Sequence, residues 1–371
     1  MVEHSLRRAH FIAVALLAMM VTAAPGGAQL AATLPLLDPA YEQLAVLEAY
    51  GLVPSGLSAI RPLSVRRVAR LVEDARGWLR ANPHESPRVR ADLESSLGRL
   101  ERRFSTDRVR GATAVLEAEI GGGRSPGRAI GEFDVALNPL WANRGGRTYG
   151  DEATAAVSAR IAFPLGSRVA VGLAGRGMGF RATGRVPRRR DGTVEAAYVR
   201  GTFGGLAIQV GRDAWWRGVG PAGGLLLSAD APPLNLLRFS TDRPLHLRVL
   251  GETEIAVTAA DLGPSQNFPH AKLFAVTITG RPNSTVRLGV TLLNKQGGDG
   301  APPAGRIERL KDLTFVWDLF RRGRDYTFSE KLLGLDVRFS VPDARGLQAF
   351  AEMTITDFVE TRLDDEMCQT K

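Results

Sequence analysis

Cysteine and histidine are scarce in this chain of 371 residues, and their scarcity excludes two kinds of site. The single cysteine, Cys368, lies near the C-terminus, so an internal disulfide and acylation of an N-terminal cysteine are both excluded. The histidines are widely spaced, without the H-E-x-x-H pattern or the clustered Cys/His spacing of a metal site. We therefore expect neither a metal nor a cofactor.

Long apolar runs are also lacking beyond the N-terminus. Arg7 and Arg8 precede an apolar run at 11–24, and small residues up to Ala28 follow it, which is the pattern of an export signal. No later segment approaches the roughly 18 to 20 apolar residues of a membrane-spanning helix. We expect residues 1–28 to be a signal peptide and the mature chain to have no helical span.

Acidic residues are fewer than basic ones, with 39 Asp and Glu against 48 Lys and Arg. Most of the cations are arginines, which bind carboxylates and phosphates in bidentate geometry. Because an exported chain does not normally meet nucleic acid, we expect an acidic polysaccharide or lipopolysaccharide as the polyanion. A solvated surface charge without a partner is the alternative.

Helical signals are confined to residues 36–105. Asp38 is expected to cap a first helix that Gly51 ends, and Ser64 and Ser86 are expected to cap two more. Apolar residues recur about every 3.6 positions along the second and third helices, at Val68, Leu71, Val72, Ala75 and Leu79 and at Val89, Leu93, Leu97, Leu100 and Phe104. A segment of about 65 residues is close to the lower limit for an independent core. We expect this bundle to pack against something larger.

From residue 111 to 358 the apolar period changes to two, which predicts a mainly β structure. Leu335, Val337 and Phe339 alternate, for example, with Asp336, Arg338 and Ser340. A soluble sandwich shows the same alternation. Small or charged residues on the polar face, tryptophans near segment ends and about 14 successive strands favour a transmembrane antiparallel outer-membrane β-barrel instead. Residues 359–371 form an atypical polar tail.

Two adjacent tryptophans, Trp215 and Trp216, are followed by a glycine-rich turn and a short apolar run. The glycines at 218, 220 and 223 match the G-x-G-x-x-G pattern of dinucleotide-binding turns. That pattern needs a helix N-terminus after the glycines, whereas Pro221 and a strand-like LLLS follow here. We therefore exclude a nucleotide site.

This central block resembles the Wzi-type capsule assembly family of outer-membrane proteins. The elements that carry the resemblance are Gly211-Arg212, Trp215-Trp216, Gly218 to Gly223, Leu225 to Ser228 and Asp230 to Pro233. A segment LEAYGL at 47–52 and GLDVRFSVP at 334–342 add to it. Three residues depart from the family pattern, since Arg217 and Val219 interrupt the compact turn and Pro232 replaces an arginine. Family members continue beyond residue 371, which implies a barrel truncated at its C-terminus.

The resemblance implies a monomeric outer-membrane barrel with a periplasmic helical bundle, acting as a non-enzymatic lectin that attaches capsular or extracellular polysaccharide to the cell surface. Sugar rings bind to aromatic faces, and their carboxylates bind to cations. The candidate ligand residues are therefore Arg212, Trp215, Trp216 and Asp230, together with Arg188, Arg189 and Arg190 in a basic loop. A purely structural role for both tryptophans, in a plug turn or an interfacial belt, is the alternative.

Two other function classes compete with the lectin. A general outer-membrane porin or channel for small solutes would share the alternating strands. A hydrolase would need a nucleophile beside a base, and the chain lacks the G-x-S-x-G motif that would supply one. We therefore expect no enzyme and keep the porin as the alternative.

Overall fold

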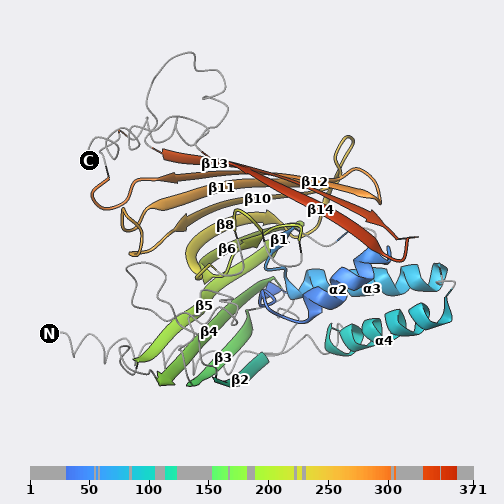
Figure 1. The fold of residues 1–371 in the computed structure, drawn as a ribbon, viewed down its shortest axis with the longest axis horizontal. Helices are drawn as coiled ribbons and strands as arrows, with labels where there is room; N and C mark the ends of the chain where they lie inside the picture. The colour runs from blue at the N-terminus through green and yellow to red at the C-terminus, as the bar shows by residue number, and fades with distance from the viewer. Residues whose placement is uncertain are drawn as a thin grey trace, which may run out of the picture.

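The computed structural model describes residues 31–53, 56, 59–82, 86–104, 113–122, 153–165, 168–181, 189–220, 224–227, 231–301, 305, 329–342 and 344–356. The predicted signal peptide and polar tail lie outside these residues, as do Trp141 and Trp317, two of the tryptophans near predicted strand ends. Three helices come first and a large antiparallel sheet follows (Figure 1).

The helices are α2 (Ala40–Ala49), α3 (Val65–Ala81) and α4 (Pro87–Phe104). Asp38 accepts a hydrogen bond from the N–H of Ala40 at 2.9 Å, and Ser64 caps α3 by accepting from the N–H of Arg67 at 3.1 Å. Gly51, with φ of +77°, follows α2. The cap at Ser64 and the end of α2 before Gly51 are confirmed, because they depend on local sequence alone. Asp38 bonds to the first turn of α2 as expected, but the N-cap residue of this helix is Pro39.

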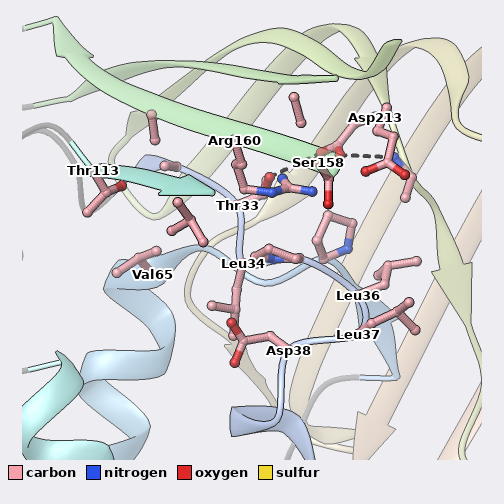
Figure 2. A pocket seen from close by; sticks show the side chains of 18 of the residues that line it. Thr33, Leu34, Leu36, Leu37, Asp38, Val65, Thr113, Ser158, Arg160 and Asp213 are labelled. Carbon is pink, nitrogen blue, oxygen red and sulfur yellow. Dashed lines mark hydrogen bonds between the residues drawn. The ribbon is translucent and has the colours of Figure 1, made fainter. Parts of the chain in front are cut away.

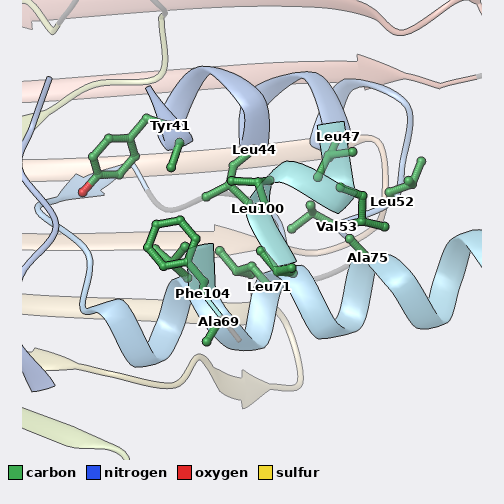
Figure 3. Packing of buried hydrophobic residues seen from close by; sticks show 14 of the residues in the cluster. Tyr41, Leu44, Leu47, Leu52, Val53, Ala69, Leu71, Ala75, Leu100 and Phe104 are labelled. Atoms are coloured by element: carbon green, nitrogen blue, oxygen red, sulfur yellow. The ribbon is translucent and has the colours of Figure 1, made fainter. Parts of the chain in front are cut away.

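The apolar stripes of the helices meet in one core (Figure 3). Leu44 and Leu47 of α2 pack with Val68 and Leu71 of α3 and with Leu100 of α4, and each is nearly inaccessible to solvent. The helices are thus held by one another as well as by the sheet described next.

The sheet contains 12 strands in the order β14-β13-β12-β11-β10-β8-β6-β5-β4-β3-β2, with β9 paired to β10. Their bounds are β2 (Thr113–Gly122), β3 (Ala153–Leu165), β4 (Val169–Arg181), β5 (Arg189–Phe203), β6 (Leu206–Asp213), β8 (Leu234–Thr241), β9 (Leu245–Leu247), β10 (Gly251–Asp261), β11 (Lys272–Arg281), β12 (Val286–Gln296), β13 (Ser329–Val341) and β14 (Leu347–Ile355). Two short strands, β1 (Ile60–Arg61) and β7 (Trp216–Arg217), form a separate antiparallel pair. Within the described residues β2 and β14 are the edges of a strongly curved sheet.

The polar face of the sheet is buried and its apolar face is exposed, which is the reverse of a soluble sandwich. On β6, Ile208 is 41% exposed while its neighbour Gln209 is 2% exposed. The same inversion runs along the sheet, with exposed apolar residues Val199, Val210, Phe239, Val257, Val276, Ile278, Leu288, Val290 and Phe339 and buried polar residues Arg200, Arg238, Thr258, Thr277, Thr291, Asn294, Lys331, Asp336 and Arg338. An apolar outer face around a polar interior is the arrangement of a β-barrel in a membrane. We call the polar interior the lumen.

The two ends of the strands differ. The connections at the helical end are short, for example Gly204–Gly205 between β5 and β6 and 282–285 between β11 and β12. At the other end the connections are longer, including 123–152, 214–233 and 297–328. Arg281 confirms the position of the helical end, because its Nη1 donates to the backbone oxygen of Val53 at 3.0 Å.

Candidate functional site

In the connection between β6 and β8, the described residues 214–220 and 224–227 turn back into the lumen, and we call these residues the plug turn. Its strand β7 pairs with β1 from the N-terminal region, with Trp216 opposite Arg61. The N–H of Gly218 also donates to the backbone oxygen of Ala59 at 3.1 Å. The plug turn therefore joins the N-terminal segment to the inside of the sheet.

Both tryptophans of the plug turn are buried, with Trp215 5% and Trp216 3% exposed. Trp215 packs with Leu236, Leu273 and Leu293 from the lumenal face of three strands. The guanidinium of Arg61 lies 4.1 Å from the ring centroid of Trp216, in cation–π geometry. Both indoles therefore pack against protein groups. They lie inside the lumen and not in a belt on the outer face of the barrel. Their predicted contact with a sugar is not tested by this geometry.

Arg217 and Val219, which depart from the family pattern, hold the plug turn to the opposite strands. Arg217 forms a buried ion pair with Asp336 of β13. Glu352 of β14 accepts from the N–H of Val219 at 2.7 Å. Gly289 of β12 leaves room for the pair, because a Cβ at this position would lie 2.3 Å from the carboxylate of Asp336. These departures therefore fit the turn to this particular lumen.

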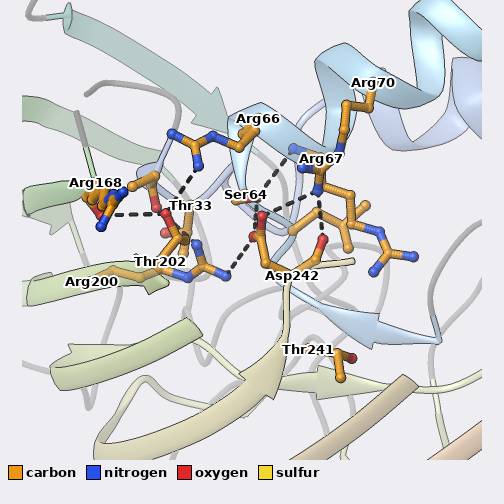
Figure 4. Close-up of polar contacts among 12 residues, drawn as sticks. Thr33, Ser64, Arg66, Arg67, Arg70, Arg168, Arg200, Thr202, Thr241 and Asp242 are labelled. Atoms are coloured by element: carbon orange, nitrogen blue, oxygen red, sulfur yellow. Dashed lines mark hydrogen bonds and ion pairs between the residues drawn. The ribbon is translucent and has the colours of Figure 1, made fainter. Parts of the chain in front are cut away.

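A second group of buried charges joins the helices to the lumen (Figure 4). Asp242, in the turn after β8, accepts from Ser64 at 2.7 Å and lies 3.1 Å from Arg70 and 3.2 Å from Arg200. Burial alone would raise the pKa of Asp242, but Arg200, Ser64 and Arg70 outweigh it and lower the pKa. This carboxylate is therefore ionised and ties α3 to the barrel wall.

Further ion pairs of the same kind connect α2 and α3 to other strands. Arg67 pairs with Glu254 of β10. Glu48 of α2 lies 3.2 Å from Arg287 of β12 and 2.8 Å from Arg338 of β13. Because all of these side chains are buried, removal of one partner leaves an uncompensated charge. The helices are thus an integral part of the lumen.

A cavity of about 500 Å³ remains between the N-terminal segment and the wall formed by β2 to β5 (Figure 2). The N-terminal side is the segment Ala32–Pro39, which we call the strap. The N–H of Thr33 in the strap donates to the hydroxyl of Tyr198 at 2.9 Å, and the Oγ1 of Thr33 lies 2.8 Å from the same hydroxyl. Tyr198 itself lies over Gly172, where a Cβ would be only 2.3 Å from the ring. The strap is therefore anchored at one side of an open space.

Polar and apolar groups face each other across this cavity. Leu36 and Leu37 of the strap contribute the apolar side, and Ser158 and Arg160 of β3 point into the space from the wall (Figure 2). Asp213 accepts from Gln209 at 2.6 Å and from Thr33 at 3.2 Å, so it is already engaged. Directional polar groups beside an apolar surface are the usual features of a small-ligand site.

Of the candidate residues named from the sequence, Arg212, Trp215 and Trp216 do not line this cavity. Arg212 lies on the outer face of β6, opposite to Asp213, and its Nε donates to the backbone oxygen of Val194 at 2.7 Å. Arg189 and Arg190 begin β5 at the end away from the helices, and only their backbone is described. Arg188 and Asp230 lie outside the described residues.

Sequence reasoning missed Ser158 and Arg160. The period of two in β3 places them on one face, but the same pattern does not say that the strap and β2 enclose a space over that face. Among the described residues, no group of three metal-ligand side chains occurs. No helix in the described part of the chain is long and apolar enough to cross a membrane.

An inverted antiparallel sheet around a polar, partly filled lumen defines an outer-membrane-type β-barrel protein. The sequence profile of the family "Capsule assembly protein Wzi" matches residues 127–364, more than half of the chain. The chain therefore belongs to the Wzi family of capsule assembly proteins.

A solved structure agrees with this assignment at the level of the fold. It is Wzi, an outer-membrane protein involved in group 1 capsule assembly in Escherichia coli and described as a carbohydrate-binding β-barrel. It is similar to this chain with a TM-score of 0.59 and 20% sequence identity, over 87% of this chain. The chain spans 63% of the length of that protein. No curated protein matches the sequence.

Proposed function

We propose that this protein is an outer-membrane lectin that binds capsular or extracellular polysaccharide and holds it at the cell surface, without catalysing a reaction. The observation that carries the proposal is the inverted burial of the sheet, in a chain that belongs to the Wzi family. The similar solved structure is described as carbohydrate-binding, which supports the same function here.

The two ends of the barrel support an orientation in the membrane. Outer-membrane barrels have short periplasmic turns and longer extracellular loops. We therefore assign the helical bundle, which lies with the short turns, to the periplasm, and the ends of β4 and β5 to the outside. The start of β5 at Arg189 then lies on the side of the surface polymer, where arginines suit an acidic polysaccharide or lipopolysaccharide phosphates.

Retention of polymer tests the proposal. Purified monomeric protein in detergent should retain an acidic capsular polysaccharide, and added salt should weaken retention because exposed charges are screened. Trp215→Ala and Trp216→Ala should lower retention, by loss of ring contacts or by loosening of the plug turn. Trp78→Ala is the matched control, because Trp78 lies exposed on α3. Equal retention by all variants would remove both indoles from the site, and no retention by wild type would refute the lectin.

Conductance in planar bilayers separates the lectin from a general porin. The plug turn and the buried ion pairs occupy much of the described lumen, so we expect almost no current through the wild-type protein. A stable conductance of porin size would favour the channel instead.

A further inference from the structure

We propose that a small pocket between α3 and the barrel wall binds one small monovalent anion of the chloride class. This inference goes beyond polysaccharide binding and does not rest on it. The pocket is lined by Arg67 of α3, by Arg200 of β5 and by Arg238 and Ser240 of β8, and we call it the arginine pocket. None of these four residues lines the larger cavity between the strap and β2 to β5.

The charges that line the arginine pocket leave one guanidinium group unpaired. The lining contains three arginines and two carboxylates, which belong to Asp242 and Glu254. Glu254 pairs with Arg67, and Asp242 pairs with Arg200. Arg238 forms no ion pair with any described residue. The pocket therefore carries an excess positive charge, which attracts an anion.

Arg238 is buried and has N–H groups that lack an acceptor. It is 3% exposed, and neither its Nε nor its Nη2 has a hydrogen-bond partner among the described residues. Trp215 lies over the guanidinium, with 5.4 Å between Cζ and the ring centroid. Such a contact leaves the N–H groups in the guanidinium plane without an acceptor. A buried, charged donor in this state is costly, and an anion would remove that cost.

The carboxylate of Asp213 does not supply the missing acceptor. Asp213 attracts Arg238 electrostatically but forms no hydrogen bond with it. The oxygens of Asp213 accept instead from Gln209, from Thr33 and from the N–H of Ala214, at 2.6, 3.2 and 2.9 Å. Asp213 also does not line the arginine pocket. Arg238 thus needs an acceptor from outside the described residues.

The strand register gathers several polar groups beside the pocket. Arg200, Gln209, Arg238 and Thr258 are direct neighbours in one row across β5, β6, β8 and β10. The hydroxyl of Thr258 is buried without a partner, as is the Nε of Arg67, which reaches the pocket from α3. Unsatisfied donors from the helix and from the sheet therefore meet at one place.

The volume of the arginine pocket limits its ligand to a small ion. The pocket has a volume of about 30 Å³. One water needs roughly 10 to 15 Å³, and sites for small organic molecules have roughly 300 to 1,000 Å³. The pocket therefore has room for a halide, whereas a sugar residue exceeds it.

Chloride binding to the full-length protein in detergent tests the inference. Broadening of the chloride NMR signal reports ions that exchange with the protein, and bromide should compete for the same site. We expect Arg238→Met to lower the affinity for chloride at least about tenfold, because a charged hydrogen-bond donor is lost. Arg243→Met is the matched control, since Arg243 is exposed in the turn after β8, and it should bind chloride as the wild type does.

Thermal unfolding provides a second measurement, followed by heat modifiability on a gel, since a folded barrel migrates differently until it is boiled. At constant ionic strength the wild type should have a higher midpoint in chloride or bromide than in isethionate, a larger monovalent anion. The reason is that a ligand that binds only the folded state stabilises it. Arg238→Met should lose this difference, whatever its own stability.

A variant that keeps the charge checks the location and serves if Arg238→Met does not form the barrel. Ser240→Val fills part of the pocket, leaves Arg238 in place and should also abolish the response to chloride. A chloride response retained by either variant overturns the inference. Equal midpoints of the wild type in chloride and isethionate, without broadening of the chloride signal, also overturn it and would show that water fills the pocket.

Discussion

The two sides of the lumen are filled to different degrees. Toward β8 to β14, large side chains such as Arg238, Asn294 and Lys331 are buried, and the guanidinium of Arg238 lies over the ring of Trp215 in the plug turn. Toward β3 to β5, the lumenal positions that line the cavity include the small residues Ala162 and Ala174. One barrel wall therefore serves as a docking surface for the plug turn, and the other leaves room for a ligand.

The largest loss of stability should follow the removal of a buried charge on the filled side of the lumen. Asp336→Ala leaves Arg217 buried without its partner, which should lower the free energy of unfolding by roughly 3 to 5 kcal/mol. Urea unfolding, followed by loss of the heat-modifiable gel form, measures this change.

A double variant sharpens that prediction. Replacement of both partners, Arg217→Met with Asp336→Leu, should recover most of the stability, because no buried charge then lacks a partner. A single Asp336→Ala variant as stable as the wild type would show that the plug turn is not held by this pair.

An intermediate loss of stability should distinguish the filled side of the lumen from the side with the cavity. Ala260 and Ala174 are both buried lumenal alanines, but Ala260 packs in the Trp215 cluster and Ala174 lines the cavity. Ala260→Leu should therefore destabilise the protein by about 1 to 3 kcal/mol through overpacking, and Ala174→Leu by less than about 1 kcal/mol. Unfolding midpoints of the two variants provide the measurement. Equal costs would show that the two sides are packed equally well.

The smallest change in stability should come from a substitution outside the barrel, in the ion pair that joins α3 to α4. Arg76 donates to Glu101 at 2.6 Å, and this hydrogen bond lowers the pKa of Glu101. A lowered pKa in the folded state means that the stabilisation is present above the unfolded pKa and is lost as pH falls through the folded pKa. Because the pair is partly exposed, Glu101→Gln should cost about 0.2 to 1 kcal/mol at pH 7.

The pH series provides the check on that pair. The difference in unfolding free energy between wild type and Glu101→Gln should shrink as pH falls below the ordinary range of a glutamate pKa. Asp92→Asn is the control on the same helix, since Asp92 is exposed and forms no ion pair within the described residues. A difference that does not change between pH 7 and acid would exclude the ion pair as its source.

Local features of the sequence predicted the helices and the alternation of the strands well. The cap at Ser64, the bond of Asp38 to the first turn of α2 and the stripe from Val68 to Leu79 act within a few residues, so a single chain is enough to locate them. The sequence singled out Arg217 and Val219, but their contacts are with Asp336 and Glu352, which lie more than a hundred positions away. No local signal identifies such partners.

The sequence by itself predicted export and determined a mainly β chain with a helical segment and the signature of its family, because periodicity, caps and motifs are local properties. Only the tertiary structure decided that the polar face is the buried one, that both tryptophans lie inside the lumen and that a cavity opens beside Arg160. The physical reason is that burial, ion pairing and empty space depend on contacts such as Arg67 with Glu254, which join residues 187 positions apart. These contacts exist only once the sheet has curved around the strap and the plug turn.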